Sequence, residues 1–462
     1  MKRAFAGGLV LALAACAEGS DYRPPALPVP ATWSHAATTA VSRETAWWRG
    51  FGDPVLDGLV AQALADSPDV EQALARVDQA RAAAGMARAG RLPTGGVAAS
   101  LARARQSLDA GLGQVGRYVP GMDRTQDQAE ASASLSWDVD FAGGLQRASE
   151  AAQADAAVAQ AGVQAARLAV AAEVVDAYLD YRAAQAQADI MARRRAAWAD
   201  RRGIMAARRG QGAVSVRQDE ESAAADARMA ALLPMAQARV ELGRQRLALL
   251  TGQPVQTALP ALAGAADIPL AGEPAAGLPG DVLRLRPDLV VAEAKLRAAH
   301  ARIGASLAEY WPKISLMGLV GQQTNALASF ASGSATVLQG AAGLRWRLFD
   351  FGRVDAEVAI ARGRQREALA AWRGAVLAAG AQVEGGFVEL AARRQAYAAA
   401  GQQAGDLARA YVRAKVAFQA GEISRDDLRM AELAMQDGED AAVTARLALA
   451  RAIAQCHRAL GL

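Results

Sequence analysis

The sequence of 462 residues has few aromatic side chains and few that bind metals. Aromatic residues make up 5% of the chain although 52% is hydrophobic, since alanine is abundant, and such a composition suits long, closely packed helices. His35, His300 and His457 are the only histidines, and no two of them have metal-ligand spacing. There is also no glycine-rich phosphate loop after a strand and no serine in a nucleophile elbow. We therefore predict that the protein is not an enzyme and needs no cofactor or metal.

An excess of charge of one sign is missing as well. The chain has 51 basic and 47 acidic residues, and the basic ones, mostly arginine, are interspersed with aspartate and glutamate. This pattern is typical of solvated helix surfaces. Near neutrality gives no reason to expect a nucleic-acid partner.

Long hydrophobic runs are absent too. No run of 18 or more apolar residues occurs after the N-terminal segment, so the sequence predicts no transmembrane helix. If the chain crosses a membrane, we expect it to do so with strands.

Cysteine occurs only at positions 16 and 456. The first twenty residues, with Lys2-Arg3 and a short apolar run, have the pattern of a secretory signal. The stretch Leu13-Ala14-Ala15-Cys16 resembles the bacterial lipobox, which implies cleavage before Cys16 and lipid on its sulfur and N-terminus. An ordinary signal peptide with a chance cysteine is the alternative, and an exported chain could also pair its two thiols in a disulfide.

In bacterial lipoproteins the residue after the lipidated cysteine helps to decide between the inner and the outer membrane. Ala17 is not the aspartate that retains lipoproteins in the inner membrane, so the lipobox resemblance implies an outer-membrane location. The following stretch, YRPPALPVPATW, is rich in proline and predicts an extended arm. Lipidation would leave Cys456 as a buried helix residue.

The chain repeats itself. At an offset of 219 residues Pro68-Asp69 matches Pro287-Asp288, and at an offset of 209 Trp137 matches Trp346. Matches of proline, glycine and tryptophan together indicate a duplication rather than chance alignment of alanines. The expected divisions are a signal peptide at 1–15, a lipidated arm at 16–46, an N-terminal helix at 47–66, a first repeat at 67–252, a linker at 253–285 and a second repeat at 286–462.

Each repeat predicts helix, strand, loop, strand, long helix, turn and helix. One proline precedes the first helix of each repeat, and a second proline, at 93 or 312, ends that helix. The expected short helices are 69–91 and 288–310, the strands 97–106, 135–141, 313–322 and 344–351, and the long helices 144 to about 202 and 353 to about 420.

The strands alternate between apolar and polar residues, most clearly where Leu344, Trp346 and Leu348 alternate with Arg345 and Arg347. A soluble sandwich has the same alternation. However, strands flanked by long helices have no second sheet in the chain to pack against, whereas barrel strands place this apolar face against lipid. Four strands leave two open edges, which are costly in lipid, so closure requires several chains.

The long helices show heptad spacing. Val376, Val383 and Leu390 are seven residues apart, as are Leu168 and Val175, which predicts helices packed side by side along their length. Sixty residues of helix extend roughly 90 Å.

Each long helix ends at a glycine followed by a serine. Gly212 and Gly421 allow a left-handed backbone, and Ser215 and Ser424 can cap the helices that follow. These segments are predicted to be the tips of helical hairpins.

These features together resemble the TolC family of outer-membrane efflux ducts, and the lipobox resembles its NodT-type lipoprotein branch. Further marks are Trp47-Trp48, Phe51, Asp53-Pro54 and Leu56 ahead of the first repeat. Ser67 stands where the family often has asparagine. The resemblance covers about residues 21–462 and implies a mainly α fold with a transmembrane β-barrel contribution: a homotrimer with one shared twelve-stranded barrel and a helical tunnel.

The resemblance also implies a function and partners. The duct would passively export small molecules, supplied by an inner-membrane efflux pump through a periplasmic adaptor that grips the hairpin tips at Gly212, Ser215, Gly421 and Ser424. Asp426 and Asp427 lie close to the family's gate aspartates, and Asp219, with Arg217 as a nearby ion-pair partner, is the counterpart in the first repeat. The alternative is that these are solvated acids favoured by the helix dipole.

A second function class shares the lipobox and the heptads. A lipid-anchored periplasmic coiled-coil scaffold, or a pump adaptor without a pore, would have both features. It would not need amphipathic strand pairs at corresponding points of the two repeats. The cargo is not encoded in any motif.

Overall fold

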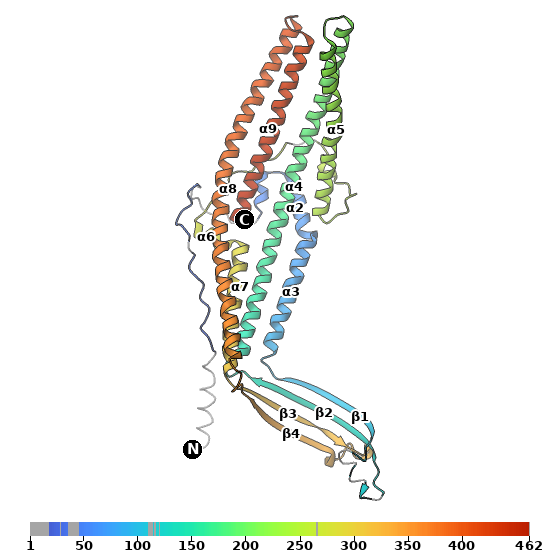
Figure 1. Ribbon diagram of the computed structural model, residues 1–462, viewed down its shortest axis with the longest axis vertical. Coiled ribbons are helices and arrows are strands. Elements are labelled where there is room, and N and C mark those ends of the chain that lie inside the picture. The colour runs from blue at the N-terminus through green and yellow to red at the C-terminus, as the bar shows by residue number, and fades with distance from the viewer. Residues whose placement is uncertain are drawn as a thin grey trace. The chain divides into compact units, whose positions relative to one another are not determined.

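A computed structural model describes residues 18–27, 29–35, 46–109, 114, 117–119, 121–264 and 267–461. The predicted signal peptide at 1–15 and the predicted lipid attachment at Cys16 lie outside the described residues. Most of the described chain is helical, with one small sheet (Figure 1).

The helices and strands follow one another in an order that occurs twice. The order of α3, β1, β2, α4 and α5 recurs as α7, β3, β4, α8 and α9. The elements are η1 (Trp47–Phe51), α2 (Pro54–Asp66), α3 (Pro68–Ala89), β1 (Thr94–Arg105), β2 (Thr125–Val139), α4 (Gly144–Gly210), α5 (Val216–Leu250), η3 (Pro260–Leu262), α6 (Pro279–Leu285), α7 (Pro287–Leu307), η4 (Ala308–Tyr310), β3 (Lys313–Thr324), η5 (Leu327–Ser329), η6 (Gly333–Ala335), β4 (Thr336–Arg345), α8 (Arg353–Gln419) and α9 (Arg425–Leu460).

The chain divides into two compact units. The strand unit comprises Met1–Pro24, Asp78–Val158 and Glu293–Ala371, and it contains the sheet. The hairpin unit comprises Pro25–Val77, Ala159–Ala292 and Trp372–Leu462.

The segment 47–66, expected to be a single helix, contains the two helices η1 and α2. Gly52 has a φ of 65° and ends η1, and Asp53 then caps α2 by accepting a hydrogen bond of 2.9 Å from the Val55 amide. Asp53 also accepts a hydrogen bond of 2.5 Å from the hydroxyl of Tyr178 on α4. Because of this tight turn, the Asp53 carboxylate accepts hydrogen bonds from both α2 and α4.

A further difference concerns the linker at 253–285, which contains η3 and the helix α6. Pro279 opens α6, where its missing N–H costs nothing, and Val282 and Leu283 are buried. Burial of Val282 and Leu283 stabilises this short helix.

The core of the hairpin unit contains the residues singled out by their heptad spacing. Val376, Val383 and Leu390 on α8 are 1–3% exposed, and Val175 on α4 is fully buried. Leu168 is only half-buried. The seven-residue spacing thus predicts the buried side of α8, whereas on α4 it marks one buried and one half-buried residue.

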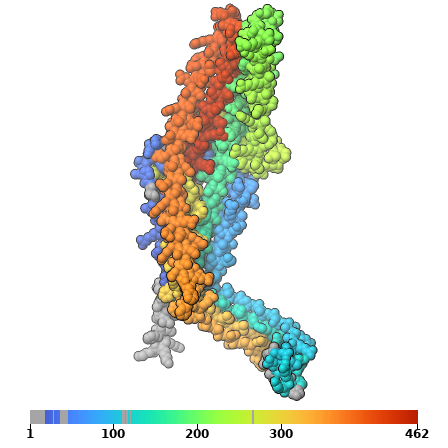
Figure 2. Space-filling model, viewed as in Figure 1, coloured from blue at the N-terminus to red at the C-terminus, as the bar shows by residue number. Residues whose placement is uncertain are grey.

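Helix α8 has the expected range, whereas α4 extends to 210 rather than to about 202. Each has 67 residues, which at about 1.5 Å per residue corresponds to about 100 Å. Side chains of α8 reach the surface along the face shown in Figure 2.

Helices α4 and α8 have a higher mean hydropathy than expected of helices that lack a continuous apolar run. Each contains an 18-residue window with a mean hydropathy of 1.2, of which 28% is buried in α4 and 22% in α8. By length and composition alone either helix could cross a membrane. Helices that do not cross a membrane can meet the same criterion, so the expectation of no such helix stays a prediction. Interspersed polar residues break an apolar run without lowering the mean hydropathy much.

The four strands form an antiparallel sheet in the order β1-β2-β3-β4. In this register Ala133 on β2 lies opposite both Val97 and Val320, and Val320 lies opposite Leu338. Side chains of directly opposed residues share a face of the sheet. One face therefore carries the large apolar residues Val97, Leu101, Leu135, Trp137, Leu316, Val320, Leu338 and Leu344.

The opposite face is mainly polar. Leu319 on this face lies opposite Ser134 on β2 and Gln339 on β4. Its polar residues include Ser100, Gln128, Glu130, Ser132, Ser134, Ser136, Ser315, Gln323 and Gln339. Along the chain the sheet thus has the alternation that the sequence predicts, but at shifted positions.

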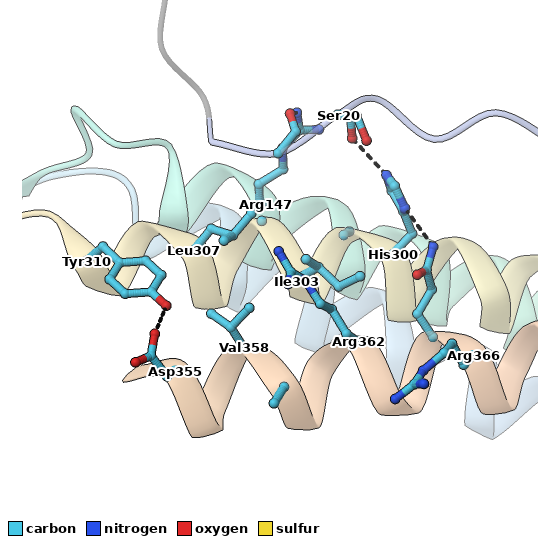
Figure 3. Close-up of a pocket in the computed structure, with 15 residues that line it drawn as sticks. Ser20, Arg147, His300, Ile303, Leu307, Tyr310, Asp355, Val358, Arg362 and Arg366 are labelled. Atoms are coloured by element: carbon cyan, nitrogen blue, oxygen red, sulfur yellow. Dashed lines mark hydrogen bonds between the residues drawn. The ribbon is translucent and has the colours of Figure 1, made fainter. Parts of the chain in front are cut away.

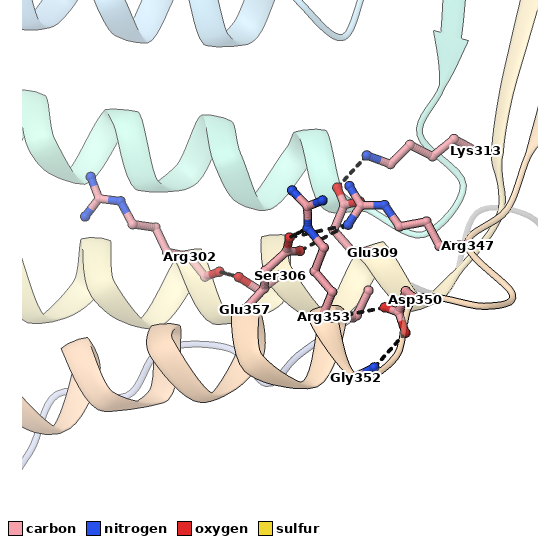
Figure 4. A network of polar contacts seen from close by, with 10 residues as sticks. Arg302, Ser306, Glu309, Lys313, Arg347, Asp350, Gly352, Arg353 and Glu357 are labelled. Atoms are coloured by element: carbon pink, nitrogen blue, oxygen red, sulfur yellow. Dashed lines mark hydrogen bonds and ion pairs between the residues drawn. The ribbon is translucent and has the colours of Figure 1, made fainter.

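The second strand of each pair begins earlier than expected. β2 occupies 125–139 rather than 135–141, and β4 occupies 336–345 rather than 344–351. After β4 the side chains bind elsewhere: the Trp346 indole donates to the Tyr310 carbonyl at 3.0 Å, and Arg347 pairs with Glu309 at 3.1 Å and Glu357 at 3.3 Å (Figure 4). Of the clearly alternating stretch 344–348, only Leu344 and Arg345 therefore belong to β4.

Candidate functional site

The two helical hairpins of the hairpin unit carry the site residues expected from the sequence. Gly212 has a φ of 67° and Gly421 a φ of 76°, as predicted for the left-handed residue that ends a helix. The Ala213 amide donates to the Arg208 carbonyl, and the Glu422 amide donates to the Ala417 carbonyl, each at 2.9 Å. Both turns therefore close their long helix with the same bond across five residues.

The serines cap the next helices as predicted. Ser215 accepts a hydrogen bond from the Gln218 amide at 3.3 Å, and Ser424 accepts one from the Asp427 amide at 3.2 Å. In each case the side chain three residues on accepts a hydrogen bond from the serine amide at 3.0 Å, which completes a capping box. Each tip is thus a tightly specified turn.

Asp427 belongs to this cap. Its carboxylate accepts hydrogen bonds from the Ser424 amide at 3.0 Å and from the Ser424 hydroxyl at 2.7 Å. These bonds hold the pKa of Asp427 below its usual value. The group is therefore ionised at neutral pH and bound to its own helix start.

Asp426 instead joins two helices that are distant in sequence. Its carboxylate accepts a hydrogen bond of 2.7 Å from the guanidinium of Arg201 on α4. The Arg201 guanidinium also lies 5.0 Å from the centre of the Trp198 ring, and both charged side chains are largely buried. An ion pair shielded from water in this way is stronger than an exposed one.

Neighbouring residues strengthen the same junction. Asp200 pairs with Arg425 at 2.7 Å and with Arg429 at 2.6 Å, so α4 and the first turns of α9 are joined by three ion pairs. Sequence reasoning missed Asp200 and Arg201. The hairpins connect α4 to α5 and α8 to α9, and no sequence signal states that α4 lies beside α9.

The pairing continues along α4 and α9. Arg194 pairs with Asp437 at 2.7 Å and also donates to the Gln436 carbonyl at 3.0 Å. Further along, Arg451 on α9 pairs with Asp176 at 2.8 Å and with Asp180 at 2.5 Å. Opposite charges thus hold these two helices together far from the tips.

Asp219 has a different partner from the one expected. It pairs with Arg209 at the end of α4 at 2.8 Å, whereas Arg217 pairs with Glu221 at 2.5 Å. Arg217 and Glu221 are four residues apart on one helix and therefore neighbours, while Asp219 lies on the side of α5 that meets α4. Asp219 consequently fastens the first hairpin across its own turn.

A hollow of about 470 Å³ lies beside the ion pairs of the hairpin unit. Arg194, Arg393, Asp437, Asp440 and Thr444 are among its lining residues. Within the described ranges no group of three or more histidine, cysteine, aspartate or glutamate side chains is placed to hold a metal ion. Cys456 is buried in α9, and burial raises the pKa of its thiol to about 12.

Comparison with known proteins decides the family. The family model described as outer membrane efflux protein matches residues 59–253 and 278–462. The chain belongs to the outer membrane efflux protein family. Membership confirms the resemblance and contradicts a scaffold without a pore.

Individual relatives agree with this family. The pyoverdine export outer membrane protein OpmQ of Pseudomonas aeruginosa is 30% identical over 454 residues, covering 98% of this chain and 94% of OpmQ. Nodulation protein T of Rhizobium leguminosarum bv. trifolii is 28% identical over 436 residues, covering 93% of this chain and 86% of that protein. The solved outer-membrane channel OprN superposes with a TM-score of 0.81 at 27% identity, covering 96% of this chain and 99% of OprN.

The family also fixes the broad function and place. This chain is an outer-membrane efflux channel protein that extends into the periplasm. Its TolC-like fold is mostly helical with a small sheet.

Proposed function

We propose that three copies of this chain form a passive duct, with their twelve strands closed into one barrel in the outer membrane. The observation that carries this proposal is the sheet itself. It has one mainly polar face and one largely apolar face, which is charged at the end of β1 and β2 where Arg103 pairs with Asp127. An apolar face of exposed side chains such as Val97 (84% exposed) and Leu338 (82% exposed) requires a covering, and lipid supplies it.

The open edges support the number of chains. Among the described residues, β1 and β4 each pair with one strand only. Unpaired edges are costly in lipid, and two chains would give eight strands, which enclose little more than side chains. Three chains leave room for a water-filled lumen lined by the polar face.

The arrangement follows a duplication, with the first repeat at 67–252 and the second at 286–462. The recurring element order and the two separate segments matched by the family model support this division. Residues 1–15 act as the signal peptide, 16–46 as the arm and 253–285 as the linker, and Cys16 carries the lipid anchor.

The tips connect the duct to its partners. Gly212, Ser215, Gly421 and Ser424 form two turns of the same design, which suits recognition by a periplasmic adaptor that links the duct to an inner-membrane pump. The duct performs no catalysis and needs no cofactor, because the pump supplies the energy. OpmQ, named for pyoverdine export, shows one cargo of a relative, and we assign small molecules in general to this chain.

The acids near the tips form the periplasmic gate. Asp426 acts through its ion pair with Arg201, Asp219 through its ion pair with Arg209, and Asp427 by capping α9. Together they hold α4, α5 and α9 in one arrangement, and opening requires the α4–α9 pairs to separate.

Ion conductance in a planar lipid bilayer tests the proposal. The full chain, extracted from outer membranes in detergent, is expected to insert as a trimer and give uniform current steps. Inserted protein that carries no current, or a monomer that stays soluble without detergent after loss of Cys16, would contradict it.

A further inference from the structure

The strand unit contains a cavity of about 780 Å³ between α7, α8 and the start of the arm. Ile303 and Leu307 of α7 and Val358 of α8 form its apolar part. Figure 3 shows Arg362 and Arg366 on α8, across the cavity from His300 and the arm. The cavity is thus apolar at one side and basic at the other.

The two arginines are not neutralised. Arg362 and Arg366 lie one turn apart, both are exposed, and neither forms an ion pair with any described residue. The one acid in the lining, Asp355, accepts a hydrogen bond from the Tyr310 hydroxyl. Two guanidinium groups at this spacing can together bind one anion.

The other basic residues of the cavity are already engaged. Arg147 donates to the Glu18 and Gly19 carbonyls at 3.2 and 3.0 Å and pairs with Glu150 at 2.7 Å. His300 lies 2.7 Å from the Ser20 carbonyl through Nε2, which must therefore donate, and Nδ1 accepts from the Gln365 amide at 3.1 Å. Both ring nitrogens of His300 and the guanidinium of Arg147 thus have partners within the chain, and only Arg362 and Arg366 remain available.

The arm fixes this cavity close to the lipid attachment. The Glu18 amide donates to the Ala142 carbonyl at 3.1 Å, and the Trp311 indole donates to the Glu18 carboxylate at 2.9 Å. Gly304 allows the close approach, since a Cβ there would lie 2.7 Å from the Glu18 carbonyl oxygen. Ser20 follows Cys16 by four residues, which span at most about 14 Å when extended.

We propose that Arg362 and Arg366 bind the phosphate of an anionic glycerophospholipid in the inner leaflet of the outer membrane. The proposal rests on the lipid anchor and membrane orientation given under Proposed function. The anchor brings the headgroup layer to the cavity, the arginines neutralise a headgroup without a compensating ammonium, and Ile303, Leu307 and Val358 contact the glycerol and the first acyl carbons.

Native mass spectrometry of the detergent-extracted full chain, titrated with phosphatidylglycerol or phosphatidylethanolamine, tests this site. Wild type is expected to retain phosphatidylglycerol in preference, and R362Q/R366Q to lose this binding by at least about tenfold, as for loss of two charged hydrogen bonds. The matched control is R81Q/R364Q, because Arg81 and Arg364 are exposed, lack an ion pair with any described residue and do not line the cavity. The control is expected to bind as wild type does.

Two results would overturn the inference. One is equal loss of phosphatidylglycerol in the two double variants, which would indicate general surface charge. The other is binding of inorganic phosphate that depends on Arg362 and Arg366 while phosphatidylglycerol does not, which would assign the site to a free anion. Conductance of the same variants separates this failure from that of the duct, since a normal current without lipid binding contradicts only the lipid site.

Discussion

Arg201 on α4 and Asp426 on α9 are joined by a largely buried ion pair of 2.7 Å, although 225 residues separate them in the sequence. Each hairpin is closed by its own turn, so this pair and those of Asp200 fasten one hairpin to the other near the tips.

Breaking this pair is predicted to open the duct. D426N removes the charge but keeps the shape, which leaves the Arg201 guanidinium without its partner at a cost of about 1–3 kcal/mol. We expect a higher closed-state current in planar bilayers and unchanged insertion. D437N, which removes one of several partners of Arg194 further along α9, serves as the control with a smaller effect.

The double variant D426A/D427A tests whether these two aspartates form the gate. If D426A/D427A leaves the closed-state current as it is in the wild type, these two residues do not form the gate.

The two faces of the sheet are predicted to tolerate arginine differently. V320R places a charge among Ala133 and Leu338 on the apolar face and is expected to reduce outer-membrane assembly, at a cost of about 2–4 kcal/mol near the bilayer centre. L319R, one residue earlier, faces Ser134 and Gln339 and is expected to assemble. The amount of trimer in isolated outer membranes measures both, and equal assembly of V320R and L319R would show that neither face meets lipid.

The link between α2 and α4 is predicted to contribute to stability. Tyr178 is fully buried, donates to Asp53 at 2.5 Å and accepts from Arg182 at 3.0 Å. Y178F leaves the Asp53 oxygen without this donor and should lower the free energy of unfolding by about 1–3 kcal/mol. Thermal unfolding in detergent checks this, with Y118F, at an 85% exposed tyrosine, as the control. Equal melting of Y178F and wild type would show that water replaces the lost bond.

Acid is predicted to weaken the hairpin unit through His457. Burial lowers its pKa to about 4 from 6.5, and its ring stacks on Trp47 at 5.3 Å. Between these two values the unfolded chain binds a proton that the folded chain does not, so stability falls as pH decreases from about 6.5 to about 4. The loss is roughly 1–3 kcal/mol.

The H457Q variant isolates this effect. Its melting temperature is expected to depend less on pH than that of wild type between pH 7 and 4.5. The same pH dependence in both proteins would assign the acid sensitivity to other groups.

Local signals in the sequence predicted the parts of the fold that depend on nearby residues. Gly212 and Ser215 specify their turn by backbone freedom and side-chain capping, which act within a few residues. Val376, Val383 and Leu390 mark the buried side of α8 because helix periodicity is fixed. The family resemblance, which depends on the order of such features, was correct for the same reason.

Features set by distant contacts were not predictable. Trp346 and Arg347 alternate as a strand does, yet they lie beyond the end of β4, where they contact Tyr310 and Glu309. The partner of Asp426 depends on which helices lie side by side, and that of Asp219 on how α5 meets α4. No spacing along the chain encodes these choices.

Disulfide trapping between β1 and β4 shows whether sister chains close the open edges of the sheet. In a Cys456→Ala background, single cysteines at 98 to 102 on β1 are combined with one at Ala341 on β4, and A133C/V320C provides an in-chain control between opposed residues. We predict that at least one pair gives crosslinked dimers and trimers and nothing larger in outer membranes. An in-chain control that crosslinks while no β1–β4 pair joins two chains would contradict it.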